Sequence, residues 1–368
     1  MSKEYDIVVY GVTGFTGKLV FEYLVNHKET ENLNLAIAGR NSEKLKKIHE
    51  DNQNVDYLVV DANDFDSVDN MCLKSNLVIS TVGPYNLYGE EVVKSCVKHS
   101  THYVDLTGEP NFVHKIRKQY SQSAIDNKSL IVNCCGFESI IPDVGTYYTV
   151  NKMKSKRKYI NYFIQANGQI SGGTWASFLN SISSSRPIIS KQSTKSKKVK
   201  KIFFHKKFKK WAMIFPVIDK HIVKRTSKEY AVYGEDFDFN EYMLFGSFLN
   251  ILTMIFGLTI VSNLAKISFI RSWLLSLKPS GSGPSKEAQK KHWFNVKIEG
   301  QGEQDSVLSV LKGGDPGYGD TSKFISEIAL CITHQYKDLN KQYGIVTPVE
   351  CTKDLLIERL MNAGIKFD

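Results

Sequence analysis

The residues best suited to chemistry are three glycines at a spacing of three. Gly11, Gly14 and Gly17 stand in "VVYGVTGFTGKLV", between an apolar run and a run with helical spacing. Glycine lets backbone N–H groups approach a phosphate closely, and a helix N-terminus adds unpaired N–H donors and a positive dipole end. The stretch predicts a turn that holds a dinucleotide pyrophosphate, with an ordinary tight turn as the alternative. Three side chains between the glycines belong to the same predicted site: Thr13, Phe15 and Thr16.

The residues after the second apolar run indicate which dinucleotide binds. That run, 33–39, leads into Arg40, Asn41 and Ser42, where NAD-binding turns usually carry a carboxylate for the ribose 2′-hydroxyl. The Arg40 guanidinium instead suits bidentate pairing with a 2′-phosphate, and Lys44 could assist it. The pattern predicts NADP, with NAD as the alternative cofactor and a solvated surface arginine as the alternative role.

Two further places are expected to contact the cofactor. Asp61, at the end of the third apolar run, is equally suited to bond the adenine amino group and to cap a helix over 64–73. Gly83 and Pro84 lie in "STVGPY", after the fourth apolar run. They are expected to line the cofactor across the crevice where strand order reverses.

Hydride transfer belongs to the cofactor, so the chain has to supply orientation, a proton and exclusion of water. Polar residues near the ends of the fourth to sixth apolar runs, and one in "SGGTW", are candidate proton donors. Four candidate proton donors are Tyr103, Asp105, Glu109 and Thr174. Four others meet the same criterion: Tyr85, Thr107, Glu138 and Asp143. A carboxylate with a pKa raised by burial suits a general acid, but loop carboxylates more often cap helices or bond backbone amides.

The cysteines indicate a reducing compartment. None of the six forms a CxxC pair, and no Cys/His cluster has zinc-ligand spacing, so we expect free thiols and no metal site. The opening "MSKEYDIVVYG" enters a strand pattern at once, so we expect no cleavable targeting segment.

Strands must position these residues, and the pattern indicates how. Runs rich in Val, Ile, Leu and Tyr alternate with helical stretches and cover 5–10, 33–39, 56–61, 76–82, 102–107 and 130–135. They lack strict alternation, as strands buried on both faces do. After Pro142 the regularity ends, and "WFNVKIEGQGE" and "SVLSVLKGG" look like two antiparallel strands. The predicted fold class is α/β, a Rossmann-type doubly wound parallel sheet with a second α/β domain containing a mixed or antiparallel sheet.

Three segments follow from this division. Residues 1–140 form the predicted dinucleotide-binding Rossmann domain. Residues 141–310 form the second domain, with a basic loop over 185–240 and a hydrophobic segment over 242–277. Residues 311–368 are expected to supply C-terminal helices that return to the Rossmann domain.

Motifs along the chain resemble, in the same order, those of the saccharopine dehydrogenase-like oxidoreductases. They are "GVTGFTG", "AGR", "STVGPYNLYGEEVVKSCVKHSTHYVDLTGE", "NCCGFESIIPD", "SGGTWAS", "GDPGYGDTSKFISEIAL" and the closing "GIVTPVE" and "LIERLMNAGIKF". The resemblance implies a nicotinamide-binding Rossmann domain and a second α/β domain. It also implies relatives among trans-acting enoyl reductases of lipid assembly and lipid-droplet proteins. It does not imply the substrate, because the chain shows no clear arginine constellation for an amino-dicarboxylic acid.

Positive charge is concentrated in one stretch. The net charge of the 368 residues is +10, and residues 191–210 contain ten lysines, with Phe203, Phe204 and Phe208 among them. A solvated, disordered loop and a site for an anionic membrane surface are equally favoured interpretations. Nucleic acid is the least favoured partner, because no recognised binding module accompanies the run.

A stretch without any charge follows at 242–265. Its length could cross a bilayer as a helix, but Asn250, Ser262 and Asn263 weaken a simple span. A span would also separate the C-terminal motifs from the Rossmann domain. We therefore expect a helix or helical hairpin that dips into one leaflet or a lipid-droplet monolayer, with a buried core helix as the alternative.

The sequence thus predicts an NADP-dependent oxidoreductase for a hydrophobic, lipid-related substrate at a lipid droplet or the cytoplasmic face of an internal membrane. Both termini are expected on the cytosolic side. The alternative is a lipid-surface scaffold or cofactor sensor with this fold and no turnover, and the alternative location is the cytoplasm. A homodimer is compatible with the sequence.

Overall fold

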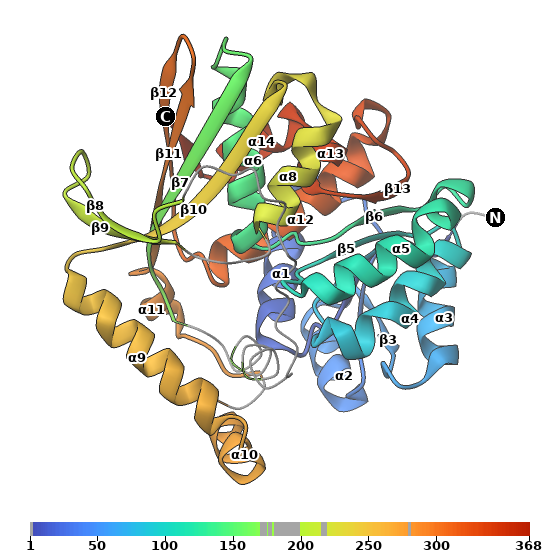
Figure 1. Ribbon diagram of the computed structural model, residues 1–368. Coiled ribbons are helices and arrows are strands. Elements are labelled where there is room, and N and C mark those ends of the chain that lie inside the picture. Colours follow the sequence, from blue (N-terminus) through green and yellow to red (C-terminus); the bar gives the residue numbers. More distant parts are fainter. Residues whose placement is uncertain (1–2, 170–174, 176–178, 180–198, 215–218, 279–280) are drawn as a thin grey trace.

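Two sheets organise the molecule. The computed structural model describes residues 3–169, 175, 179, 199–214, 219–278 and 281–368, and its strands form two seven-stranded sheets (Figure 1). The glycine turn and the other predicted cofactor contacts lie on the first sheet. The uncharged stretch at 242–265 belongs to the second sheet and to a helix attached to it. The described part of the lysine-rich run, 199–210, also belongs to the second sheet and its turns.

The first sheet is parallel and doubly wound. Its strands are β1 (Tyr5–Tyr10), β2 (Leu35–Gly39), β3 (Asp56–Val59), β4 (Ser75–Ser80), β5 (His102–Asp105), β6 (Leu130–Val132) and β13 (Gly344–Val346). Their order is β13-β6-β5-β4-β1-β2-β3, and every pairing is parallel. Strand order therefore reverses between β1 and β4, which confirms the predicted Rossmann-type sheet.

Helices cover both faces of this sheet, as the apolar runs predict. Ile7 and Val9 face one core, and Val8 and Tyr10 face the other. The first core is covered by α1 (Phe15–Val25), α2 (Ser42–Asp51), α6 (Phe137–Asn151) and α12 (Gly319–His334). The second core is covered by α3 (Phe65–Lys74), α4 (Tyr85–Lys98) and α5 (Pro110–Asp126).

The second sheet is mixed, as predicted. Its strands are β7 (Arg157–Asn167), β8 (Ile202–His205), β9 (Lys210–Ile214), β10 (Asp236–Phe245), β11 (Trp293–Gly302), β12 (Ser306–Gly313) and β14 (Lys366–Phe367). Only β7 and β10 pair in parallel, and β11 and β12 form the expected antiparallel pair. Helix α6 packs on this sheet so closely that a Cβ on Gly145 would lie 2.6 Å from Ile298. One core cluster therefore continues from the first sheet through α6 into the second.

The C-terminal part of the chain contributes to the first sheet. Strand β13 pairs with β6, and α12 packs beside α1. The remaining short elements here are η3 (Tyr336–Asp338), α13 (Pro348–Thr352) and α14 (Asp354–Asn362). Buried Arg359 of α14 bonds Glu327 of α12 at 2.7 Å and Glu29 of η1 (Lys28–Thr30) at 2.6 Å, which ties these segments together. The boundaries at 140 and 310 stay predictions.

The uncharged stretch corrects one expectation. Residues 242–245 belong to β10, and the helix α9 (Phe248–Leu264) begins only after Ser247, whose hydroxyl caps it. Among α9 residues only Ile251 is buried, so the core-helix alternative is wrong. A second helix, α10 (Ser268–Ser276), follows after a short turn and gives the pair expected of a helical hairpin. No helix in the described ranges is long and apolar enough to cross a membrane.

The lysine-rich stretch is partly a hairpin. Residues 191–198 lie outside the described residues, and 202–214 form the antiparallel β8–β9 hairpin at the edge of the second sheet. A disordered loop is therefore wrong for this part. Phe203 and Phe208 explain the difference, because their rings pack on Phe163 of β7 and anchor the hairpin. The other connecting helices are α8 (Asp219–Glu229), η2 (Ala231–Tyr233) and α11 (Lys286–Gln289).

Candidate cofactor and active site

Two of the three turn glycines are fixed by packing and the third is not. Gly11 has φ of +95°, and a Cβ there would lie 2.6 Å from Thr81 Oγ1. A Cβ on Gly17 would lie 2.2 Å from the Gly11 carbonyl oxygen. Gly14 stands at the N-cap of α1 in extended conformation, without a side-chain cap, and its Cβ would meet only the Gly11 oxygen at 3.2 Å. Apart from this one close backbone contact no other atom is near a Cβ at Gly14, so the turn leaves room there for a pyrophosphate to approach.

Arg40 lies beside this turn. Strand β2 pairs with β1 up to Ala38, and the Gly11 amide donates to the Ala38 carbonyl at 2.8 Å. The Arg40 side chain is exposed and makes no hydrogen bond or ion pair among the described residues. Lys44 is also exposed, one turn into α2, whose N-cap is Asn41. Arg40 and Lys44 are thus two exposed cations near the end of β2, and their pairing with a 2′-phosphate stays a prediction.

The other predicted cofactor contacts reach the same edge. Thr13 lies against the end of β2, 3.7 Å from the position of a Cβ on Gly39. Thr81 donates from its amide to the Tyr10 carbonyl at 2.9 Å, which holds the start of the loop with Gly83 and Pro84 against the end of β1.

Asp61 does not cap a helix. Helix α3 is capped by Asp64, whose carboxylate accepts from the Asp66 amide at 3.2 Å. Asp61 accepts from the backbone and side-chain amides of Asn63 instead, at 2.9 and 3.1 Å. The capping alternative for Asp61 is therefore wrong, and its cofactor role stays a prediction.

Glu109 and Asp105 are occupied by the fold. The Glu109 carboxylate accepts from the Tyr85 and Asn86 amides, each at 2.9 Å, and so caps α4 from a neighbouring loop. Asp105 is fully buried and accepts from the Thr107 and Cys134 amides and from the Asn133 side chain. Burial raises the pKa of Asp105 to about 6. These bonds favour structural roles for both carboxylates.

The other candidates differ in accessibility. Tyr103 is fully buried, and Thr174 lies outside the described residues. Asp143 is fully buried and accepts from the Val349 amide at 3.2 Å. Glu138, in the first turn of α6, has an exposed side chain, yet the surrounding protein disfavours its charged form and raises its pKa.

Sequence reasoning missed one pair, His292 and Asp315. His292 Nδ1 lies 2.8 Å from Asp315 Oδ1, and both side chains are almost fully buried. The two residues are far apart in the sequence and match no spacing rule. The run of glycines around Asp315 in "GDPGYGD" is the one signal that a tight, specific loop occurs there.

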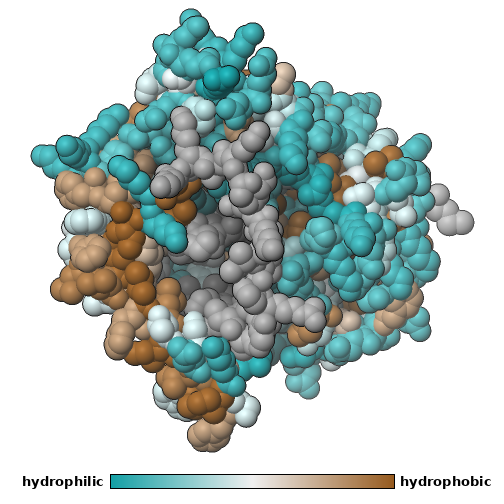
Figure 2. All heavy atoms as spheres, viewed as in Figure 1, coloured by the Kyte–Doolittle hydropathy of each residue, from teal (hydrophilic) through white to brown (hydrophobic). Residues whose placement is uncertain are grey.

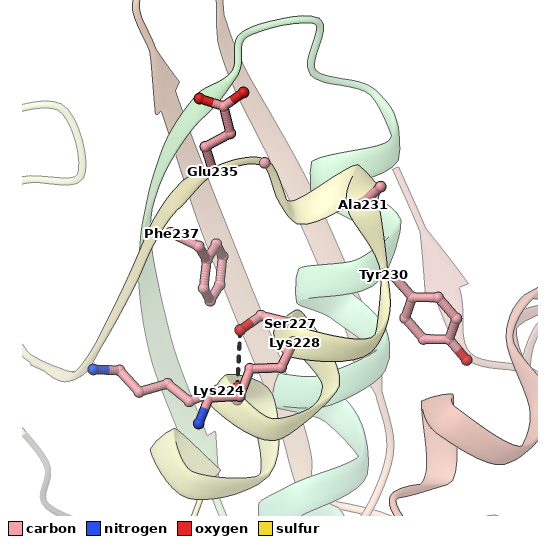
Figure 3. A pocket seen from close by; sticks show the side chains of 8 residues that line it. Lys224, Ser227, Lys228, Tyr230, Ala231, Glu235 and Phe237 are labelled. Atoms are coloured by element: carbon pink, nitrogen blue, oxygen red, sulfur yellow. Dashed lines mark hydrogen bonds between the residues drawn. The ribbon is translucent and has the colours of Figure 1, made fainter.

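A surface hollow elsewhere contains none of the predicted site residues. It has a volume of about 680 Å³, and Figure 3 shows the side chains around it. Its lining comes from α8, η2 and the start of β10: Lys224, Ser227, Lys228, Tyr230, Ala231, Gly234, Glu235 and Phe237. The hollow borders the second sheet and not the glycine turn, so the fold-based site takes precedence.

The doubly wound sheet, the glycine turn and the unpaired arginine define a dinucleotide-binding protein. Residues 7–133 match the saccharopine dehydrogenase NADP binding domain family. A saccharopine dehydrogenase-like oxidoreductase of Rattus norvegicus is 27% identical over 99% of this chain and 97% of its own. Residues 7–133 therefore match an NADP binding domain, and the whole chain is similar to the saccharopine dehydrogenase-like oxidoreductases, as its motifs predict.

Two other similar proteins add to this picture. A lipid droplet localized protein of Caenorhabditis elegans is 29% identical over 93% of this chain and 92% of its own. The apo saccharopine dehydrogenase (L-Glu forming) of Saccharomyces cerevisiae has a TM-score of 0.57 at 12% identity, over 99% of both chains. That second likeness shows a shared fold of both sheets.

Proposed function

We propose that this protein is an NADP-dependent oxidoreductase that acts on a hydrophobic, lipid-related substrate at the surface of a lipid droplet or an internal membrane. The exposed outer surface of α9 and α10 carries this proposal. Leu249 is 65% exposed, Phe256 68% and Phe269 82%. Figure 2 shows apolar side chains gathered over these helices. Contiguous exposed apolar surface of this kind marks an interaction site.

The polar residues of α9 fit a lipid surface better than a protein groove. Helix α9 carries no charged residue, and Thr253, Thr259 and Asn263 bond backbone carbonyls of their own helix. Its polarity is therefore partly satisfied without water. Bulky apolar side chains exposed on a helix can be buried in the boundary between headgroups and acyl chains, and binding grows with the apolar area that they bury there. The lipid droplet relative from Caenorhabditis elegans supports this location.

Helices α9 and α10 are connected to the side of the molecule that carries the glycine turn. Trp175, directly after the "SGGT" motif, donates from Nε1 to the Leu274 carbonyl of α10 at 2.6 Å. Beyond α10 the chain reaches Gly283, where a Cβ would lie 2.5 Å from the Phe15 ring in the glycine turn. Lys286 then pairs with Glu22 of α1 at 3.2 Å. A substrate drawn from lipid at α10 would thus be close to the segments that border the cofactor.

The chain's own part in the reaction follows from this geometry. The open turn at Gly14 would hold the pyrophosphate, and Arg40 and Lys44 would hold the 2′-phosphate. Bound NADP would supply or accept the hydride. The protein would orient the cofactor at the carboxyl edge of the first sheet and exclude water there.

A flotation experiment tests the proposal. Triacylglycerol droplets coated with phosphatidylcholine should carry the full-length protein to the top of a density gradient. The double variant Leu249→Ser, Phe256→Ser should stay below, because it loses the two exposed anchors. Leu73→Ser, which removes a side chain 54% exposed on α3, is the matched control and should float. A wild-type protein that does not float would overturn the lipid-surface part.

Turnover is tested separately. A lipid extract incubated with the protein and NADPH should yield a product heavier by two hydrogens, detected by mass spectrometry. A protein that binds NADPH and droplets but yields no such product would support the scaffold or cofactor-sensing alternative instead.

A further inference from the structure

His292 and Asp315 form a buried hydrogen-bonded pair with a defined orientation. Their side chains are 5% and 3% exposed, and Nδ1 lies 2.8 Å from Oδ1. The other carboxylate oxygen accepts from the Gly319 amide at 3.1 Å, in the first turn of α12. Asp315 is thereby fixed, and the bond assigns the Nδ1 proton to the side facing the carboxylate. Nε2 has no hydrogen-bond partner in the described part of the chain and stays available for chemistry.

The pair lies at one end of the second sheet. His292 directly precedes β11, whose first residue Trp293 pairs with Asn167 at the end of β7. Strand β12 ends at Gly313, paired with Phe294, two residues before Asp315. A Cβ on Gly168 would lie 3.9 Å from Asp315 Oδ1. The ends of β7, β11 and β12 therefore place the pair at one end of the second sheet.

That end of the second sheet faces the carboxyl edge of the first. The Phe294 ring lies 4.8 Å from that of Phe137, which opens α6 after β6. The Phe137 amide donates to Thr321 Oγ1 of α12 at 3.1 Å. Tyr318, three residues after Asp315, packs edge-on against Phe15 at 5.0 Å. Because Phe15 is the first residue of α1, the pair stands near the glycine turn.

We propose that His292 is the acid–base residue of the reaction and that Asp315 is its positioning residue. The inference rests on the proposed oxidoreductase function. In reduction of a C=O or C=C bond, two electrons and one hydrogen reach a substrate carbon as hydride from the reduced nicotinamide. The second hydrogen goes as a proton from Nε2 to the carbonyl oxygen or the neighbouring carbon. The neutral imidazole then regains a proton from water, and oxidation runs these transfers in reverse.

The carboxylate makes His292 suited to this task. Asp315 holds the ring in one tautomer and stabilises the imidazolium that forms when Nε2 takes up a proton. Glu109, Asp105 and Asp143 are bonded to backbone amides or fully buried, whereas Glu138 is an exposed titratable group among the described residues after β6. A donor at Glu138 is the competing assignment.

Nuclear magnetic resonance of the full-length protein tests the placement without a substrate. Histidine is labelled in its ring, and the His292 signals are identified by their loss in His292→Asn. When NADP+ saturates the wild type, we expect the His292 signals to shift and to show nuclear Overhauser contacts with nicotinamide protons. His102, a half-buried histidine at the amino end of β5, is the internal control and should do neither.

The outcomes distinguish a failure of the His292 assignment from a failure of the proposed function. Saturation by NADP+ with unshifted His292 signals and no contact to nicotinamide protons would overturn the role of His292. A protein that does not bind NADP+ at all would instead overturn the proposed function. For Asp315 the readout is the ¹⁵N shifts of the His292 ring in Asp315→Asn. They should report a changed tautomer, whereas an unchanged tautomer would refute the positioning role.

Discussion

The indole of Trp211 packs against the ring of Phe248, with centroids 5.0 Å apart. Trp211 belongs to β9 of the lysine-bearing hairpin, and Phe248 is the first residue of α9. Phe204 of β8 extends the contact, 5.7 Å from Trp211. The basic hairpin and the apolar helix therefore form one continuous surface, in which charge and apolar burial act side by side.

The hairpin lysines should add a salt-dependent attraction to that surface. Replacing Lys206, Lys207 and Lys209 by Ser should weaken binding to vesicles of phosphatidylcholine with phosphatidylserine. At about 1 kcal/mol for each lysine near an anionic surface, the loss is on the order of a hundredfold at low salt. The loss of binding should vanish at high salt, because dissolved ions screen the attraction between the lysines and the anionic lipids. Serine at exposed Lys118, Lys337 and Lys366 is the control, and equal losses in both triples would refute a local effect.

Arg40 should set the cofactor preference. We expect NADPH to bind more tightly than NADH by about 10- to 100-fold, the range that charge-assisted hydrogen bonds contribute. Arg40→Ala should remove most of this difference, whereas Arg157→Ala, at an exposed arginine of the second sheet, should keep it. Calorimetry at one salt concentration measures all the affinities. Equal affinities of the unmodified protein for the two cofactors would contradict the assignment.

Gly14 and Gly17 should respond differently to a side chain. Gly14→Val should abolish dinucleotide binding and leave the fold intact, because its side chain would occupy the approach of the pyrophosphate and would press on a single backbone atom, the Gly11 carbonyl oxygen at 3.2 Å. Gly17→Val should destabilise the protein, since its side chain would collide with the Gly11 carbonyl. Gly246→Val, where a Cβ meets nothing within 4 Å, is the control. Circular dichroism and cofactor titration together give the answer, and normal binding by a folded Gly14→Val protein would make the turn merely structural.

Asp143 should make stability depend on pH. Burial raises the pKa of Asp143 to about 7, so the folded state holds a proton that the unfolded state releases near its ordinary value of 3.8. The free energy of unfolding should therefore fall as pH rises from about 4 to about 7, by up to roughly 4 kcal/mol, and stay level above. Asp143→Asn keeps an oxygen for the Val349 amide and should flatten most of this slope. Denaturant unfolding at several pH values measures it, and an unchanged slope would exclude Asp143 as the cause.

The Rossmann half of the fold could be predicted because its signals are local. Strands β1 and β4 contain uninterrupted apolar runs at 7–10 and 77–79, and the glycine turn follows β1 directly along the chain. The same locality led to the error at 242–265. Absence of charge suggested a helix or helical hairpin over the whole stretch, whereas Tyr242 to Phe245 pair with β9 and extend a strand. That pairing depends on β9, a separate strand that the residue pattern of 242–265 does not reveal.

The site could be predicted only in part for a related reason. Arg40 and Gly14 are recognised by their position after a strand. Glu109 instead caps the N-terminus of α4, a helix that it does not adjoin in the sequence. His292 and Asp315 meet through the registers of β11 and β12, which a single sequence does not reveal. The pairing of residues across a sheet is set by tertiary contacts and not by spacing along the chain.

Strand β13 and helix α12 have a consequence for biosynthesis. A nascent chain can form β1 to β6 early, but Phe324, Ile325 and Ile328 of α12 cover part of one face of that sheet only later. At about 5–20 residues per second, the wait from β6 to α12 is on the order of ten seconds. During that time the unfinished sheet presents apolar side chains and the free edge of β6, which chaperones bind. A message broken before the codons for α12 would thus encode every glycine of the turn without yielding a stable dinucleotide site.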